Sequence, residues 1–195
     1  NWDLSREFPV PNHRVIADKA EALKIIRDNN MKHDPDFALG TEWLTDATAQ
    51  YCDYIHIYER TAGPNSFIDW FRYTFPEVVI SDREIRDDTD IERRVNNTLL
   101  KGLRNDIEIY RCRDLIDKTP RYQAYLAKAN AIKERYADLL LAGTYRDTEG
   151  FAVKCKAAIE ARAYVAGDGM AIVATRTTEG KAVPATIEAP GYRFV

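Results

Sequence analysis

Short, unbroken apolar runs alternate along the first two thirds of the chain with longer segments of helical periodicity. The run Val78-Val79-Ile80 opens after Pro76 and closes on Ser81. Neighbouring side chains of a strand face opposite sides, so this run predicts a strand with both faces buried, as in a parallel α/β sheet. A second apolar run over residues 37–41 predicts another such strand.

Helix signals separate these runs. Asn12 can cap the first helix, Gly102 can end a later one in the left-handed conformation, and Pro120 opens the longest. The predicted helices cover residues 13–29, 45–52, 87–100 and 120–141, and the predicted strands cover 37–41, 78–81 and 106–110. Residues 54–58 form a further short apolar stretch. The first helix should bury a stripe made of Val15, Ile16, Leu23 and Ile26.

The character of the sequence changes after Gly150. Residues 151–195 are rich in Val, Thr, Ala and Gly and carry almost no helical periodicity. Residues 170–176 and 185–189 are predicted as strands, joined by a hairpin-type turn at Glu179-Gly180. This segment predicts the start of a β-sandwich. Three or four β/α units are too few for an eight-stranded barrel, so the first part is either an open sheet or one piece of a larger enzyme.

The composition argues against some classes of function. The 195 residues are 45% hydrophobic and 30% charged, with a net charge of −3. This balance predicts a globular protein with a core, without a basic face for nucleic acid and without a membrane span. The three cysteines are scattered and share no ligand spacing with the histidines, so free thiols are expected, and neither a metal nor another cofactor is expected.

Ionisable residues follow both apolar runs where each predicted strand ends. They are Glu42, with Trp43 beside it, after the first run, and Asp82, Arg83 and Glu84 after the second. In α/β barrels the residues just past the carboxyl ends of the strands line the active site. Cleavage of a glycosidic bond needs two carboxyl groups, one as an acid and one as a nucleophile or base. The pattern therefore indicates a sugar-cleaving site.

Glu42 is the first catalytic candidate, because Trp43 could give a sugar face an apolar platform. Asp82 and Glu84 are the candidates on the second strand, where an extended backbone would aim them the same way. Substrate binding is assigned to Trp43, Asp46 and Arg83.

Each candidate also has a purely structural interpretation. Glu42 could pair with an arginine at a helix start, Asp46 could cap a helix, and residues 82–84 could form a loop bridged to arginines. The acidic run 87–92 lacks the glycine and glutamate positions of a calcium loop, so a solvated helix start is predicted there.

The block from Phe71 to Phe151 resembles a known family. The segments that carry the likeness are 71–84 (FRYTFPEVVISDRE), 94–97 (RVNN) and 134–147 (ERYADLLLAGTYRD). They resemble the back half of large, uncharacterised bacterial glycoside-hydrolase-like proteins, in which an α-galactosidase-type (β/α)8 barrel precedes a C-terminal β-sandwich. The resemblance implies an α/β fold class: a partial (β/α)8 TIM-type barrel over residues 1–148, then the start of an all-β sandwich domain over 149–195.

The function implied for the intact parent is hydrolysis of glycosidic bonds through a carboxylate pair, with a carbohydrate as the substrate. The front half of the barrel, and any carboxylate on its strands, would then lie outside this sequence. One alternative is a non-catalytic carbohydrate-binding or interaction module that uses exposed aromatics of residues 67–75. Another is a remnant whose open strand edges associate with a missing N-terminal segment or another chain.

Overall fold

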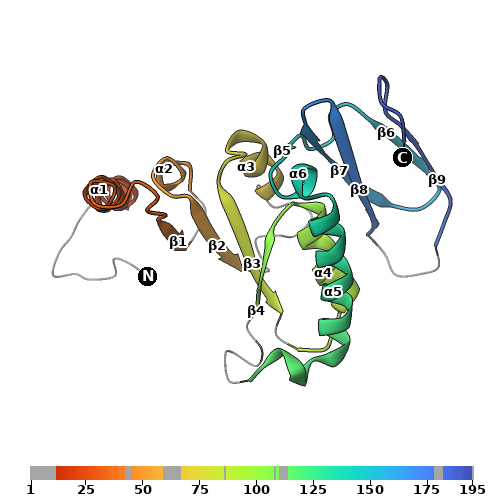
Figure 1. Cartoon of the computed structure of the whole chain (residues 1–195), viewed down its shortest axis with the longest axis horizontal. Helices are drawn as coiled ribbons and strands as arrows, with labels where there is room; N and C mark the ends of the chain where they lie inside the picture. Colours follow the sequence, from red (N-terminus) through yellow and green to blue (C-terminus); the bar gives the residue numbers. More distant parts are fainter. Residues whose placement is uncertain are drawn as a thin grey trace. The chain divides into compact units, whose positions relative to one another are not determined.

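The computed structural model of the chain describes residues 12–42, 45–58, 67–85, 87–107, 109, 114–177 and 182–194 (Figure 1). The chain divides into two compact units, Asn1–Ile57 with Glu77–Ile80, and Tyr58–Pro76 with Ser81–Val195. The domain boundary predicted after residue 148 falls inside the second unit and stays a prediction. Among the described residues no helix is both long enough and apolar enough to cross a membrane.

Four short strands form one parallel sheet whose spatial order, β1-β2-β3-β4, is also their order in the sequence. The strands are β1 (Gly40–Glu42), β2 (Tyr54–Tyr58), β3 (Val79–Ile85) and β4 (Arg104–Ile107). Helices lie between them along the chain, so the predicted α/β class is confirmed. The short apolar stretch over residues 54–58 forms β2.

The first unit holds α1 (Asn12–Asn30), β1, α2 (Asp46–Ala49) and most of β2. Asp53 ties this unit together, because its carboxylate accepts hydrogen bonds from Arg27 at 2.6 Å and from the Leu39 amide at 2.9 Å. Cys52 beside it is a buried free thiol, Cys155 of the second unit is also free, and Cys112 lies outside the described residues. The predicted stripe on α1 is only partly right, since Leu23 is buried but Ile16 is 50% and Ile26 44% exposed.

Strand β3 is longer than predicted. Its pairing with β4 runs on from Ser81, so the candidates at 82–84 lie within the strand and not beyond its end. Arg83 lies opposite Asp106, with 3.8 Å between Nε and Oδ2, and this cross-strand ion pair lets charged residues continue the strand. Val79 is 37% exposed, so the prediction that both faces of the run are buried fails for this residue.

The second unit contains the helices that follow β2, β3 and β4 along the chain. They are α3 (Ile68–Thr74), α4 (Ile91–Leu100), α5 (Pro120–Arg135) and α6 (Ala137–Leu140), with a 3-10 turn, η2 (Ile116–Lys118), before α5. Helices α4 and α5 pack side by side (Figure 1) through a core that includes Val95, Tyr122 and Leu126. The helix predicted over 120–141 is divided at Tyr136, whose backbone leaves the helical region.

Helix α4 ends as Gly102 predicts. Gly102 has φ +65°, its amide donates to the Leu99 carbonyl at 3.3 Å, and the Leu103 amide donates to the Thr98 carbonyl at 2.8 Å. These two bonds form a Schellman motif, which needs a residue in the left-handed conformation. The Tyr164 hydroxyl donates to the Leu100 carbonyl at 2.7 Å, so a strand side chain satisfies another terminal carbonyl of this helix.

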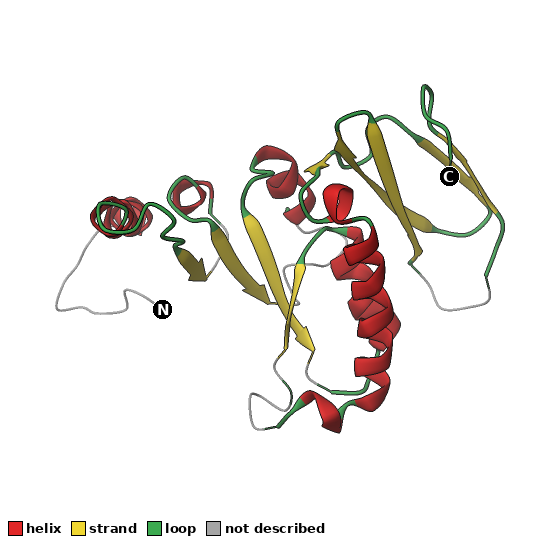
Figure 2. Ribbon diagram, in the orientation of Figure 1, coloured by secondary structure: helices red, strands yellow, loops and turns green. Residues whose placement is uncertain are grey.

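The C-terminal part consists of antiparallel strands (Figure 2). They are β5 (Thr144–Tyr145), β6 (Ala152–Cys155), β7 (Ile159–Ala166), β8 (Gly169–Arg176) and β9 (Ala185–Glu188). One sheet has the order β5-β7-β8, and β6 pairs with β9. Strands β8 and β9 were both predicted, but they do not pair with each other as a hairpin: β8 pairs with β7, which the sequence analysis missed. The predicted turn residue Gly180 lies outside the described residues.

Candidate functional site

Glu42 is the last residue of β1, and it is exposed. Its backbone carbonyl accepts a hydrogen bond from the Lys19 ammonium at 3.1 Å. The structure thus places an accessible carboxylate where the sequence analysis predicted it, at the carboxyl end of a parallel strand. Trp43, its predicted platform, lies outside the described residues.

Asp46 occupies the first turn of α2 and is exposed. Thr45, one residue earlier, is the helix cap, since its hydroxyl accepts from the Thr48 amide at 3.1 Å. The Asp46 carboxylate accepts from the amide of Ala47 at 2.8 Å, which suits a negative charge at a helix N-terminus. The helix therefore explains the local position of Asp46 without a ligand, and its substrate-binding role stays a prediction.

The candidates on β3 belong to the second unit and differ in accessibility. Asp82 is fully buried, opposite Asn105 in the register with β4, and Arg83 is engaged with Asp106. The side chain of Glu84 lies outside the described residues. A carboxylate without accessible surface does not meet a ligand from solvent in this conformation, which distinguishes Asp82 from Glu42.

A buried lysine lies beside β4. The Lys133 ammonium, on α5, donates to the Leu103 carbonyl and to Asn105 Oδ1, each at 3.1 Å. Both acceptors are neutral. Burial, with the nearby positive charge of Arg104, lowers the pKa of Lys133 to about 8. Since the lysine packs between a helix and a strand, its geometry indicates a structural role.

A charged group of the second unit with several partners is Asp69, in the first turn of α3. Its carboxylate accepts two hydrogen bonds from Arg162 on β7, at 3.1 Å and 2.9 Å, and one from Lys101 at 3.1 Å. The Tyr145 hydroxyl on β5 also donates to it. We call Asp69, Lys101, Tyr145 and Arg162 the Asp69 network.

Electrostatics inside the Asp69 network are strongly coupled. Burial alone would raise the pKa of Asp69, but hydrogen bonds from Arg162 and Tyr145, and attraction to Lys101 and Arg162, outweigh it and lower this pKa. Burial and the adjacent carboxylate raise the pKa of Tyr145 far above its usual range. Arg162 also pairs with Asp147, with 2.9 Å between Nε and Oδ1. The buried charges of the network are thus paired within the fold, which is typical of a structural role.

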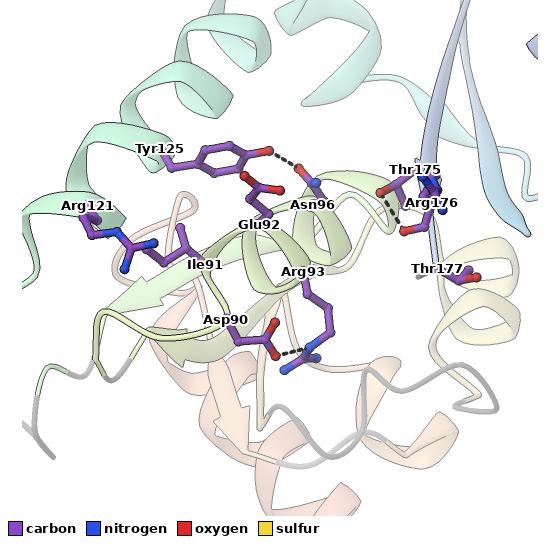
Figure 3. Close-up of a pocket in the computed structure, with 10 residues that line it drawn as sticks. All are labelled: Asp90, Ile91, Glu92, Arg93, Asn96, Arg121, Tyr125, Thr175, Arg176 and Thr177. Atoms are coloured by element: carbon purple, nitrogen blue, oxygen red, sulfur yellow. Dashed lines mark hydrogen bonds and ion pairs between the residues drawn. The ribbon is translucent and has the colours of Figure 1, made fainter. Parts of the chain in front are cut away.

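A groove of about 780 Å³ opens between α4, α5 and the end of β8, all within the second unit (Figure 3). Its lining consists of Asp90, Ile91, Glu92, Arg93, Asn96, Arg121, Tyr125, Thr175, Arg176 and Thr177. All but Ile91 carry a polar side chain, and the charged ones have both signs. Within the described residues no group of three or more His, Cys, Asp or Glu could hold a metal ion.

Sequence reasoning missed the Asp69 network and most of the groove. Asp69 lies within the segment 67–75, for which only the aromatic residues were considered as candidates. Arg162 lies 93 positions further along the chain. The one available signal was an arginine among apolar residues in the segment that forms β7. The acidic start of α4 was recognised, but nothing in the sequence joined it to β8.

Comparison of the chain with models of protein families, with curated protein sequences and with solved structures gave no match.

Proposed function

We propose that this chain forms part of a glycoside hydrolase with a (β/α)-barrel architecture, and that Glu42 is one of its two catalytic carboxyl groups. The observation that carries this proposal is the position of an exposed glutamate at the last residue of a parallel strand. The predicted candidates for the second carboxyl group are Asp82 and Glu84. The antiparallel strands after residue 150 would begin the β-sandwich.

The strand order supports a barrel arc over the other common parallel architecture. In doubly wound sheets the strand order reverses at a switch point, whereas in a barrel each strand lies beside the next one in the sequence. The order β1-β2-β3-β4 has no reversal. In barrels the carboxyl ends of the strands carry the chemistry, and Glu42 is at such an end.

The test is hydrolysis of a panel of aryl glycosides by the intact parent protein and by its Glu42→Gln variant. Gln keeps the shape of the side chain but can act neither as an acid nor as a nucleophile. The matched control is Glu77→Gln. Glu77 is exposed and lies just before β3, at the amino-terminal end of the strand, where residues of a barrel contribute to stability and not to catalysis. We expect Glu42→Gln to abolish turnover and Glu77→Gln to keep it. Equal turnover by both variants would refute the assignment of Glu42.

A second candidate function has its own observation. Helix α3 presents Phe67, Trp70 and Tyr73 at a spacing of three residues, with exposures of 46%, 58% and 41%. Exposed aromatic rings on one helix face can stack on sugar rings, as a non-catalytic carbohydrate-binding module would require. The test is retention of the chain on insoluble polysaccharides, comparing Trp70→Ala with Phe194→Ala, an aromatic that is 66% exposed elsewhere in the second unit. Equal retention of both variants would exclude this face.

A further inference from the structure

The groove between α4, α5 and β8 has the chemistry of a ligand site distinct from Glu42. Three separate elements supply its walls: the first turns of α4, the first turns of α5 and the last residues of β8 (Figure 3). Ligand sites combine a concave shape with a small number of positioned polar groups. The polar groups of the groove therefore determine which ligand it can bind.

The lining of the groove contains both hydrogen-bond donors and hydrogen-bond acceptors. Arginine and asparagine side chains donate, Asp90 and Glu92 accept, and the hydroxyls of Tyr125, Thr175 and Thr177 do both. Ile91 contributes the one apolar side chain of the lining. A ligand that fills this space must offer many hydrogen-bonding groups of both kinds.

The charges of the groove nearly cancel, since three arginines face two acidic residues and leave a net charge of +1. Asp90 pairs with Arg93 at the start of α4. In the part of the chain that the structure describes, neither Glu92 nor Arg121 is engaged in an ion pair. One carboxylate and one guanidinium thus remain available to a ligand. The two acidic residues disfavour a strongly anionic ligand, and the three arginines disfavour a cation.

One wall of the groove is held in place before any ligand arrives. The Tyr125 hydroxyl donates to Asn96 Oδ1 at 3.0 Å, which leaves the Asn96 amide hydrogens available (Figure 3). The Tyr125 ring packs against the core between α4 and α5. Side chains fixed in this way lose little entropy on binding, which favours affinity.

We propose that this groove binds a neutral oligosaccharide. Each hydroxyl of a sugar both donates and accepts a hydrogen bond, so vicinal hydroxyls match a lining that mixes arginine, glutamate, asparagine and threonine with little net charge. Glu92 would accept from the ligand and Arg121 would donate to it. The inference shares its substrate class with the proposed function, but it does not depend on Glu42.

The experiment is a titration of the whole chain, followed by NMR or calorimetry, with neutral hexasaccharides: cellohexaose, maltohexaose, mannohexaose and xylohexaose. Glu92→Gln and Arg121→Gln should each weaken the binding of the preferred sugar about tenfold, or about 1.4 kcal/mol, because each variant loses a charged hydrogen bond to the ligand. The matched controls on α5 are Glu134→Gln and Lys128→Gln, which are exposed and lie outside the lining. Both controls should bind like the unmodified chain.

The outcomes separate this proposal from the rival ones. Failure of all four sugars to bind, or equal weakening by the control variants, would overturn it. Selective binding of hexagalacturonic acid would identify the groove as an anion site and overturn the assignment to a neutral ligand. Loss of binding in Trp70→Ala alone would place the sugar on α3. Hydrolysis of aryl glycosides without oligosaccharide binding would refute the groove as a sugar site but not the catalytic role of Glu42. Oligosaccharide binding without hydrolysis would refute the catalytic role of Glu42 but not the sugar site in the groove.

Discussion

The second unit contains two charged regions built from the same residue types but with opposite organisation. In the Asp69 network the side chain of Lys101 is 1% exposed and that of Arg162 is 12% exposed, and both bond to one carboxylate. In the groove, Glu92 and Arg121 are exposed and neither is engaged in an ion pair among the described residues. Charge that is buried and mutually bonded holds elements together, whereas charge left accessible can meet a ligand.

The difference follows from the cost of removing charge from water. Desolvation of a buried ion costs several kcal/mol unless its partners are well placed, so removing one partner of a buried pair is expensive. An exposed ion pair contributes about 0–1 kcal/mol. The stability of the protein should therefore respond very differently to the loss of a single charge in the two regions. Mutations in each region test this difference.

The largest effect is expected for Asp69→Asn. Two cations and a tyrosine hydroxyl would lose their shared carboxylate, so the free energy of unfolding should fall by about 3–5 kcal/mol. Urea denaturation measures this loss. Asp90→Asn is the matched control, because Asp90 pairs with Arg93 at an exposed site and should change stability by less than about 1 kcal/mol. Similar losses in both variants would contradict the distinction between the regions.

Acid should erase the difference between the chain and Asp69→Asn. The pKa of Asp69 is lowered in the folded state, so its stabilisation is fully present above the unfolded pKa of about 4 and is lost as the pH falls through the folded pKa. The two stabilities should therefore converge below about pH 4. A gap that stays constant down to pH 2 would mean that the carboxylate charge is not what stabilises the network.

The next effect concerns Lys133, a buried lysine whose acceptors are neutral, in contrast to Lys101, which bonds to a carboxylate. The folded pKa of Lys133 is about 8, below its ordinary value of 10.5. Between these two values the unfolded chain binds more protons than the folded one, so stability should rise with pH across this window. The rise should reach about 3 kcal/mol relative to Lys133→Met, in which the group is absent. Parallel pH profiles of the two proteins in urea denaturation would refute it.

A smaller effect is expected for Gly102→Ala, beside the Asp69 network. Gly102 has φ +65°, and a Cβ there would approach the Tyr164 ring to 2.9 Å. Strain and contact together should cost about 2 kcal/mol. Gly167→Ala is the control, since Gly167 has φ +56° but open space around it. It should show only the backbone cost of about 1 kcal/mol, measured by thermal unfolding. Equal losses of stability in the two variants would mean that contact with the Tyr164 ring does not limit the side chain at position 102.

Local signals predicted most of the helices and strands. Gly102 predicted the end of α4, because a left-handed residue is a requirement of the chain itself, and residues 54–58 are the strand β2. Strand β3 was ended too early, since its continuation depends on Asp106 in another strand. Strand β7 was missed because Glu160 and Arg162 interrupt its apolar pattern. These two residues pair with each other within the strand, and Arg162 also bonds to Asp69 on α3.

The sites divide in the same way. An exposed Glu42 at a strand end could be predicted, because that position depends only on where an apolar run stops. The Asp69 network could not, since its contacts join residues separated by 32 to 93 positions. The groove needs the packing of α4, α5 and β8, and no local pattern reports that arrangement.

The smallest effect on stability is expected in the groove itself, and it is the sharpest test of the comparison. Glu92→Gln and Arg121→Gln should each change the free energy of unfolding by less than about 0.5 kcal/mol, as surface substitutions usually do. The double variant should show a coupling energy near zero, because no ion pair joins the two side chains. The corresponding cycle for Asp69 and Arg162 should show a coupling above about 1 kcal/mol, because these two residues are in direct contact. A large coupling between Glu92 and Arg121 would mean that they stabilise the fold and are not available to a sugar.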